Sequence, residues 1–434
     1  MWKFYRKIAI TLLLLGTIAG SGLYASETAK PEPIPYDEIR RFTDAFAEIK
    51  ANYVEEVSDN TLLENAIRGM LDGLDPHSSY LNKEDFSDLQ ESTSGEFGGL
   101  GIEVTMENGF VKVVSPIDDT PAQRAGILPG DVVIRLGDKP VKGMSLNDAV
   151  KLMRGKPGTS IELTIVREGA EAPIRLSVER DIIRIKSVRG ELLEPGYAYV
   201  RLSTFQTRTG RDMVELIENL IKKNKSNLKG LILDLRNNPG GVLSSAREVA
   251  DAFLDGGLVV YTKGRTEDSE MRYNATPGDV INGTPMVVMV NGGTASASEI
   301  VAGAIQDHVR GIIMGSNTFG KASVQTVLQL DDGAAIKLTT ARYYTPKGRS
   351  IQAEGIKPDI KLRQARVELL DSDEIEPVKE SDLSRHLDNP QLKEDTGKTG
   401  KENKQKQSLA KRDYQLFEAL NLLKGLNLLQ AKTR

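Results

Sequence analysis

Ser296 lies at a point of the sequence from which a hydroxyl group can act as a nucleophile. The apolar run Met286–Val290 predicts a buried strand that stops at Asn291-Gly292-Gly293, and a helical pattern begins directly after the serine. A serine at this turn presents its hydroxyl beside a helix N-terminus, where the Ala297 amide and the helix dipole stabilise an oxyanion. Serine is also a common helix cap, and Ser298 is a second candidate nucleophile. The position therefore predicts either a nucleophile or a cap.

A nucleophilic serine needs a base, and this chain offers few. It contains no Cys and three His. His308 lies 12 residues further along the same predicted helix, about 18 Å away at about 1.5 Å per residue, while His77 lies in a turn-forming loop and His386 in a charged tail. Lysine becomes a base when burial lowers its pKa, and Lys321 follows a predicted strand and turn with apolar residues nearby. A solvated surface group is the alternative role of Lys321.

Four sequence motifs, two of which contain these residues, together resemble the carboxyl-terminal processing proteases (tail-specific proteases) of peptidase family S41. The resemblance spans residues 36–360 and includes the 25-residue separation of Ser296 and Lys321. One departure is Ala322, where many members have Gly; its Cβ would be strained at a glycine-only backbone angle, and we expect the site to tolerate it. The motifs are Ser296-Ala297-Ser298-Glu299-Ile300, Phe319-Gly320-Lys321 with Gln325, Leu233-Asp234-Leu235-Arg236-Asn237-Asn238-Pro239-Gly240-Gly241, and Tyr343-Tyr344-Thr345-Pro346-Lys347-Gly348-Arg349-Ser350-Ile351-Gln352.

The resemblance implies a serine endopeptidase with a Ser–Lys dyad on an α/β core of the ClpP/crotonase-like kind. Ser296 would be the nucleophile, Lys321 the general base, and Gln325 the side chain that holds and orients the lysine amine. An ordinary lysine has a pKa near 10.4 and is protonated at pH 7, but burial lowers that value by up to about 3–5 units. A buried Lys321 is therefore able to accept the serine proton.

The resemblance also implies an oxyanion hole built from two segments. It would combine the Ala297 amide with an amide of the Gly240-Gly241 turn, and Gly241 is the expected donor. Three His are too few for a metal site built on several imidazoles, and the absence of Cys excludes zinc–thiolate sites. We therefore expect neither a metal nor a cofactor.

Residues 95–182 resemble a PDZ domain. The resemblance rests on the glycine-rich loop Gly98-Gly99-Leu100-Gly101-Ile102, the turn Ala125–Asp131 and a short helix capped by Ser145. It implies that the loop amides capture a peptide's C-terminal carboxylate while the peptide adds as a strand beside the loop strand and the helix. Glycine in such a loop also serves tight turns, so the turn and helix carry much of the inference.

Arg154 ends the short helix of this segment. We hypothesise that it couples an occupied peptide groove to the active site, so that the PDZ domain gates the dyad. The alternative role is local, because a cation near a helix C-terminus stabilises the helix. The sequence leaves both roles open.

The rest of the chain divides by composition. Residues 36–94 predict a helical region, 183–360 the protease core, 361–408 a charged linker and 409–434 a C-terminal helix for oligomerisation or docking. Apolar residues recur at steps of three and four in the N-terminal region, which predicts helices with one apolar face. That face either packs on the core or forms a dimerisation arm.

Residues 1–25 predict an export signal. Lys3, Arg6 and Lys7 precede the apolar run Ile8–Gly20, and Leu23-Tyr24-Ala25 offers a cleavage site. The expected location is the periplasm, with an inner-membrane association if the signal stays uncleaved. With 57 basic and 61 acidic residues the net charge is −4, which argues against nucleic acid as a partner.

These observations predict an exported serine endopeptidase that cleaves proteins recognised through accessible, apolar C-terminal tails, in cell-envelope protein turnover. The resemblance also suggests a helical-repeat adaptor lipoprotein as a partner and a homo-oligomer assembled through the terminal helices. One alternative is a catalytically silent PDZ scaffold on a degenerate protease core, against which Ser296, Lys321 and Gln325 together argue. A crotonase-type acyl-CoA enzyme is another, against which the export signal and the PDZ segment argue.

Overall fold

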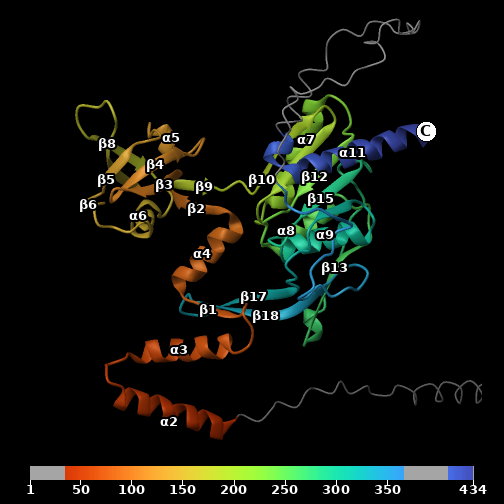
Figure 1. Cartoon of the computed structure of the whole chain (residues 1–434). Coiled ribbons are helices and arrows are strands. Elements are labelled where there is room, and N and C mark those ends of the chain that lie inside the picture. The colour runs from red at the N-terminus through yellow and green to blue at the C-terminus, as the bar shows by residue number, and fades with distance from the viewer. Residues whose placement is uncertain (1–34, 366–408, 434) are drawn as a thin grey trace, which may run out of the picture. The chain divides into compact units, whose positions relative to one another are not determined.

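The computed structural model describes residues 35–365 and 409–433, and the chain divides after Met70 into two compact units (Figure 1). The first unit contains α2 (Tyr36–Asn52) and most of α3 (Asp59–Asp72), joined by an ion pair between Lys50 and Asp59. Both predicted N-terminal helices are therefore present. Their apolar faces are exposed, and include Ile39, Phe42, Ile49, Leu63 and Met70.

A β-rich module occupies residues 96–184 of the second unit. Its elements are β2 (Glu96–Gly99), β3 (Ile102–Glu107), β4 (Phe110–Pro116), α5 (Pro121–Arg124), β5 (Val132–Leu136), β6 (Lys139–Pro140), α6 (Leu146–Met153), β7 (Ser160–Val166), β8 (Ile174–Glu179) and β9 (Asp181–Arg184). The main sheet has the order β3-β4-β5-β7-β8, so β3 is an edge strand, and β2 pairs with β9. Ser145 and Asp148 form the capping box of α6. The apolar faces of the sheet and α6 close over one core that includes Val111, Val133 and Leu163.

The rest of the second unit is built on a mostly parallel sheet covered on both faces. Its elements are β10 (Val188–Glu194), β11 (Tyr197–Leu202), α7 (Thr209–Asn224), β12 (Gly230–Asp234), α8 (Leu243–Asp251), β15 (Met286–Val290), α9 (Ala297–Asp307), β16 (Ile312–Gly315) and β19 (Ile360–Lys361). The strand order is β10-β11-β12-β15-β16-β19, and only β10 pairs in antiparallel fashion. Alternate side chains point to opposite faces, so Val288 packs under α7, α8 and α9 whereas Val287 faces the C-terminal helix. The predicted α/β core with helical terminal segments is confirmed.

A second sheet lies beside the core and was not predicted from the sequence. It consists of β1 (Ser79–Leu81), β13 (Leu258–Gly264), β14 (Arg272–Asn274), β17 (Ser323–Gln329) and β18 (Ala335–Tyr344); α4 (Lys83–Ser94) follows β1, and the 3-10 turn η1 (Glu267–Ser269) lies between β13 and β14. The long strand β18 pairs with β17 on one side and with β1 and β13 on the other. Strand β17 starts two residues after Lys321. This sheet therefore positions the predicted base.

The C-terminal helix α11 (Tyr414–Thr433) packs on the sheet face opposite α9, with Leu420 and Leu423 buried. Just before the helix, Asp413 accepts hydrogen bonds from both terminal nitrogens of Arg236, at 3.0 and 2.6 Å. Arg236 also donates to the fully buried Asp234 at the end of β12. Within the described ranges, no helix is long and apolar enough to cross a membrane. The predicted export signal and most of the predicted linker lie outside those ranges.

Candidate active site

Ser296 occupies the sharp turn between β15 and α9, in a backbone conformation that is rare outside glycine. Its φ is 54° and its ψ is −117°. Hydrogen bonds hold the residue through its backbone: its N–H donates to Glu299 Oε2 at 2.8 Å, and its carbonyl accepts from Tyr343 Oη at 3.0 Å. Non-glycine residues in such conformations cluster at functional sites, and a strained strand–turn–helix is how many α/β enzymes expose a nucleophilic serine. The geometry therefore favours the nucleophile over the cap.

The backbone amides next to Ser296 fit an oxyanion hole. Ala297 is the first residue of α9, and its N–H precedes the helical hydrogen bonds, the first of which come from Ser298 and Glu299. The N–H of Gly240 donates to Asn238 Oδ1 at 2.9 Å, so Gly241 has the remaining amide of this turn. Gly240 allows the close approach, because a Cβ there would lie 2.8 Å from Ser296 Cβ.

Lys321 lies half-buried in the loop before β17. Burial is the main cause that lowers the pKa of its amine; the charge of Lys337 acts in the same direction, and Asp75 opposes both. The structure shows no hydrogen bond between Lys321 Nζ and Ser296 Oγ, both of which it describes. The neighbouring Ala322 is fully buried and has no positive φ, so its Cβ causes no backbone strain. The lowered pKa of Lys321 favours the neutral amine, which is the form in which a lysine acts as a base.

Gln325 belongs to a hydrogen-bonded chain beside the lysine rather than to the lysine itself. Its amide donates to Ser323 Oγ at 3.0 Å and to Thr339 Oγ1 at 3.2 Å, and Thr339 donates to Asp75 Oδ1 at 3.1 Å. The role of Gln325 in orienting the amine therefore stays a prediction. Asp75 comes from the loop before β1. His77 lies in the same loop, and burial, followed by the charge of Lys321, lowers its pKa.

Three residues that surround Ser296 and Lys321 were not among the predicted site residues. Asp75 lies in the turn-forming loop that contains His77, and it accepts the Ser78 hydroxyl and the His77 N–H. The spacing of Ser296 and Glu299 is that of a capping box, a signal that was available in the sequence. Lys337 comes close to Lys321 only through the pairing of β17 with β18, which no local pattern indicated.

The glycine-rich loop and α6 line one groove of the β-rich module. A cavity of about 140 Å³ lies between them; the predicted loop residues Gly99, Leu100, Gly101 and Ile102 line it together with Val150, Met153 and Arg154. Gly98 lies beside it and accepts a hydrogen bond from the Gly155 N–H. Because β3 is an edge strand, an extended peptide can pair with it in this groove.

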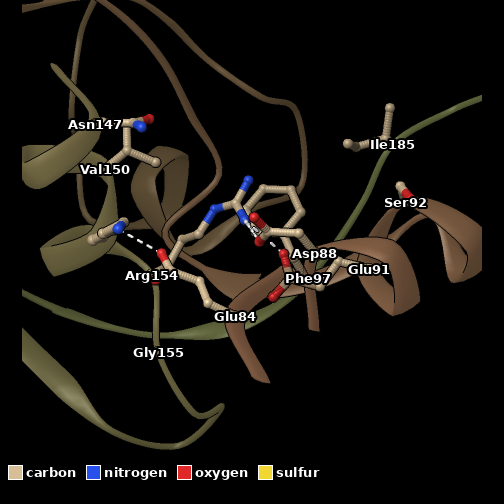
Figure 2. Close-up of a pocket in the computed structure, with 11 residues that line it drawn as sticks. Glu84, Asp88, Glu91, Ser92, Phe97, Asn147, Val150, Arg154, Gly155 and Ile185 are labelled. Carbon is tan, nitrogen blue, oxygen red and sulfur yellow. Dashed lines mark hydrogen bonds and ion pairs between the residues drawn. The ribbon is translucent and has the colours of Figure 1, made fainter. Parts of the chain in front are cut away.

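Arg154 lies where this groove meets helix α4, in a second cavity of about 530 Å³ (Figure 2). Its Nη1 donates to Glu91 at 2.6 Å and lies 3.8 Å from Asp88, and its guanidinium stands 4.8 Å above the Phe97 ring. Its Nε is buried without a hydrogen-bond partner among the described residues. A second ion pair joins Lys151 of α6 to Glu84 of α4. Helix α4 therefore holds the end of α6 through charge pairs.

No group of three or more His, Asp or Glu side chains that fits a metal ion occurs in the described part of the chain. His308 Nε2 lies 2.7 Å from the Leu258 carbonyl oxygen, which can only accept, so His308 donates this hydrogen bond and has a local role. His386 lies outside the described residues.

Comparisons with known proteins agree with this geometry. The chain matches peptidase family S41 over residues 196–362 and a PDZ domain over residues 98–178. Residues 17–85 match the N-terminal domain of the activating protease CtpB. Along the chain, the three matches come in the order N-terminal domain, PDZ domain and peptidase.

Similar proteins cover most of the chain. A carboxy-terminal-processing protease of Bartonella bacilliformis is 46% identical over 409 residues, which make up 92% of this chain and 91% of the relative. The carboxy-terminal processing protease CtpA of Bacillus subtilis is 36% identical over 375 residues, or 84% of this chain and 77% of that protein. Among solved structures, the photosystem II D1 C-terminal processing protease is 34% identical, with a TM-score of 0.44 over 74% of this chain and 86% of that one.

The site and the matches together define the class as a serine peptidase that carries a PDZ domain. The chain belongs to peptidase family S41, among the carboxyl-terminal processing proteases.

Proposed function

We propose that the chain is an exported endopeptidase that uses Ser296 as nucleophile and Lys321 as general base, and that selects proteins by their C-terminal tails. The observation that carries this proposal is the strained Ser296 backbone at a helix N-terminus beside a half-buried lysine of lowered pKa. The proposed dyad accounts for the chemistry, and the PDZ groove supports recognition of the substrate through its C-terminal tail.

The proposed reaction proceeds in two halves. The neutral Lys321 amine accepts the hydroxyl proton of Ser296 while the Oγ attacks the scissile carbonyl, and the Ala297 and Gly241 amides hold the oxyanion. The resulting ammonium gives its proton to the leaving amine as the C–N bond breaks, which leaves an acyl-enzyme ester. A water molecule, deprotonated by the same amine, then hydrolyses that ester and restores the serine. The two side chains must first approach each other, since no hydrogen bond joins them in this structure.

The test is cleavage of an unstructured polypeptide with an apolar C-terminus by the purified full chain. The Ser296→Ala variant is expected to lose turnover by at least about 10³-fold, because its alanine has no nucleophile. Ser298→Ala is the matched control, since Ser298 Oγ donates to the Asn238 carbonyl and the residue lies two positions further along the chain. Cleavage that survives in Ser296→Ala, or that is lost only in Ser298→Ala, would contradict the assignment.

We further propose that Arg154 couples tail binding to the dyad. The supporting contacts run from Arg154 to Glu91 of α4, along α4 to β1, and from the loop before β1 to Lys321 through the charge of Asp75. Arg154 also lines the peptide groove, so a bound tail reaches its guanidinium directly. A movement of α4 on tail binding then changes the electrostatic environment of the Lys321 amine.

The Arg154→Ala variant is expected to lose stimulation by the tail. For wild type, the cleavage rate of a substrate with a free apolar C-terminus should exceed that of the same substrate with an amidated C-terminus. In Arg154→Ala the ratio of these two rates should fall to about one, while the rate on the amidated substrate is unchanged. Lys151→Ala, which breaks the exposed pair with Glu84, is the control and should keep the wild-type ratio. Equal ratios in all three proteins would contradict the coupling.

Location and assembly also belong to the proposal. The basic and apolar pattern of residues 1–25 supports export to the periplasm, and proteins of the cell envelope are then the substrates. The exposed apolar faces of α2 and α3 support a homo-oligomer assembled through the terminal helices. A helical-repeat adaptor lipoprotein is proposed as a partner on the family resemblance.

A further inference from the structure

Glu299 is a fully buried carboxylate whose two oxygens are held by four donors from two segments of the chain. Its Oε2 accepts the backbone N–H of Ser296 at 2.8 Å and that of Lys321 at 2.9 Å. Its Oε1 accepts the Gly320 N–H at 2.7 Å and the Thr318 hydroxyl. One oxygen atom thus joins the peptide units of the nucleophile and of the base.

Tyr343 joins the same two residues on their other side. Its single phenolic proton is shared between the Ser296 carbonyl oxygen, 3.0 Å from Oη, and the Lys321 carbonyl oxygen. The ring is 2% exposed, and burial, followed by the charge of Glu299, holds the pKa of the phenol well above its ordinary value. Burial therefore favours the protonated phenol, the form in which Tyr343 donates its hydrogen bond.

We propose that Glu299 and Tyr343 form a clamp that fixes the nucleophile turn against the lysine loop, and that both are positioning residues for the reaction. The inference rests on the proposed roles of Ser296 and Lys321. Neither clamp side chain has a recorded contact with Ser296 Oγ or Lys321 Nζ, so each acts through the backbone of the residue that reacts.

A reaction between Ser296 and Lys321 requires that the two chain segments carrying them be held at a fixed separation. Ser296 and Lys321 come from different segments, and the strained φ of Ser296 persists only where the surroundings over-determine it. Displacement of a reacting group by about 1 Å costs about 10²-fold in rate, so the separation of the two peptide units must be fixed. Tying both N–H groups to one atom and both carbonyls to another fixes it from two sides.

The test substitutes each clamp residue by its nearest isostere in the full chain. Tyr343→Phe removes only the hydroxyl, and Glu299→Gln turns one acceptor oxygen into an NH₂ group that faces two N–H donors. Both variants are expected to lower kcat by about 10- to 100-fold with KM unchanged. The rate at which a fluorophosphonate labels Ser296 should fall by a similar factor, since that reaction uses the same nucleophile without a protein substrate.

Two matched variants separate positioning from stability. Tyr344→Phe makes the same change on the next residue, whose ring stacks on Tyr261, and Asp307→Asn changes a buried acid at the other end of α9 that pairs with Arg349. Both should keep kcat and the labelling rate even where the melting temperature falls. Clamp variants that match wild type in kcat and labelling rate, or whose kcat loss is equalled by these controls, would overturn the clamp. If the wild-type chain neither cleaves the polypeptide nor is labelled at Ser296, the proposed function is contradicted, and the clamp with it. If the wild type is labelled but does not cleave, the labelling rates of the variants still test the clamp.

Discussion

The Lys321→Met variant is expected to cleave an unstructured polypeptide about 10²- to 10⁴-fold more slowly than wild type, the range that a general base contributes. Methionine keeps an unbranched apolar side chain in the half-buried site but has no amine, so the hydroxyl of Ser296 loses its proton acceptor. Initial rates at saturating substrate measure the effect. Lys337→Met is the companion variant, because it removes a nearby charge that is not the base and should keep turnover at high pH. Full activity of Lys321→Met would assign the base elsewhere.

The same substitution is expected to raise the melting temperature. Burial first, and then the charge of Lys337, lower the pKa of Lys321 in the folded chain, whereas unfolding restores the ordinary 10.5. Between the two pKa values the folded state binds fewer protons than the unfolded state, so stability rises with pH across that window and is lowest below it. Methionine has no charge to desolvate. Its advantage over lysine should therefore be largest below the lowered pKa of Lys321 and shrink towards pH 10.5.

The pH dependence of wild-type cleavage follows from the same cause. Activity should rise with the fraction of neutral Lys321, with a midpoint below 10.5. Removing the repulsion of Lys337 raises the pKa of Lys321, so the midpoint of Lys337→Met should lie at a higher pH than that of wild type. A lysine of the PDZ module, such as the exposed Lys139, supplies the control substitution. An unmoved midpoint in Lys337→Met would contradict the proximity of the two amines.

The turn that carries Ser296 was predictable because its signals are local. An apolar strand, a glycine turn and a helix start place Ser296 within one short stretch of sequence, and the structure reproduces β15 and α9 there. The clamp was not predictable from such signals. Glu299 reads as a capping residue, and its bonds to Gly320 and Lys321 exist only after the two segments have packed. Tyr343 reaches the site across the β17–β18 sheet.

The second sheet, like the clamp, could not be predicted from local sequence patterns. The core strands β12 and β15 are continuous apolar runs buried on both faces, which a sequence pattern indicates directly. Strand β17 is exposed over most of its length and mixes Val, Gln and Thr, so no periodicity separates it from a loop. Its partner β18 becomes a strand by pairing with three segments at once. Tertiary pairing, rather than local propensity, therefore shapes the surroundings of Lys321.

Replacing Arg236 with alanine is expected to lower the free energy of unfolding by about 3–5 kcal/mol, the range for removing one partner of a buried ion pair. The Arg236 side chain is 14% exposed and bonds to both Asp234 and Asp413. Asp234 keeps Arg201 and Tyr199 as partners, so the loss falls mainly on Asp413 and on the docking of α11. Urea unfolding measures the stability, and hydrogen–deuterium exchange should show α11 losing protection.

Lowering the pH tests whether the stability lost in Arg236→Ala comes from the ion pair with Asp413 rather than from lost packing. Burial acts to raise the pKa of Asp413, but the hydrogen bonds and charge of Arg236 outweigh it and lower that pKa below the ordinary 3.8. The pair therefore stabilises wild type fully above pH 3.8, and this contribution is lost as the pH falls through the lowered value. The difference in unfolding free energy between Arg236→Ala and wild type should therefore become smaller as the pH falls through that range. Arg167→Ala, which breaks the Asp131 pair in the PDZ module, should destabilise the chain while α11 stays protected. Protection of α11 in Arg236→Ala as well would mean that its apolar contacts with the sheet suffice to hold it.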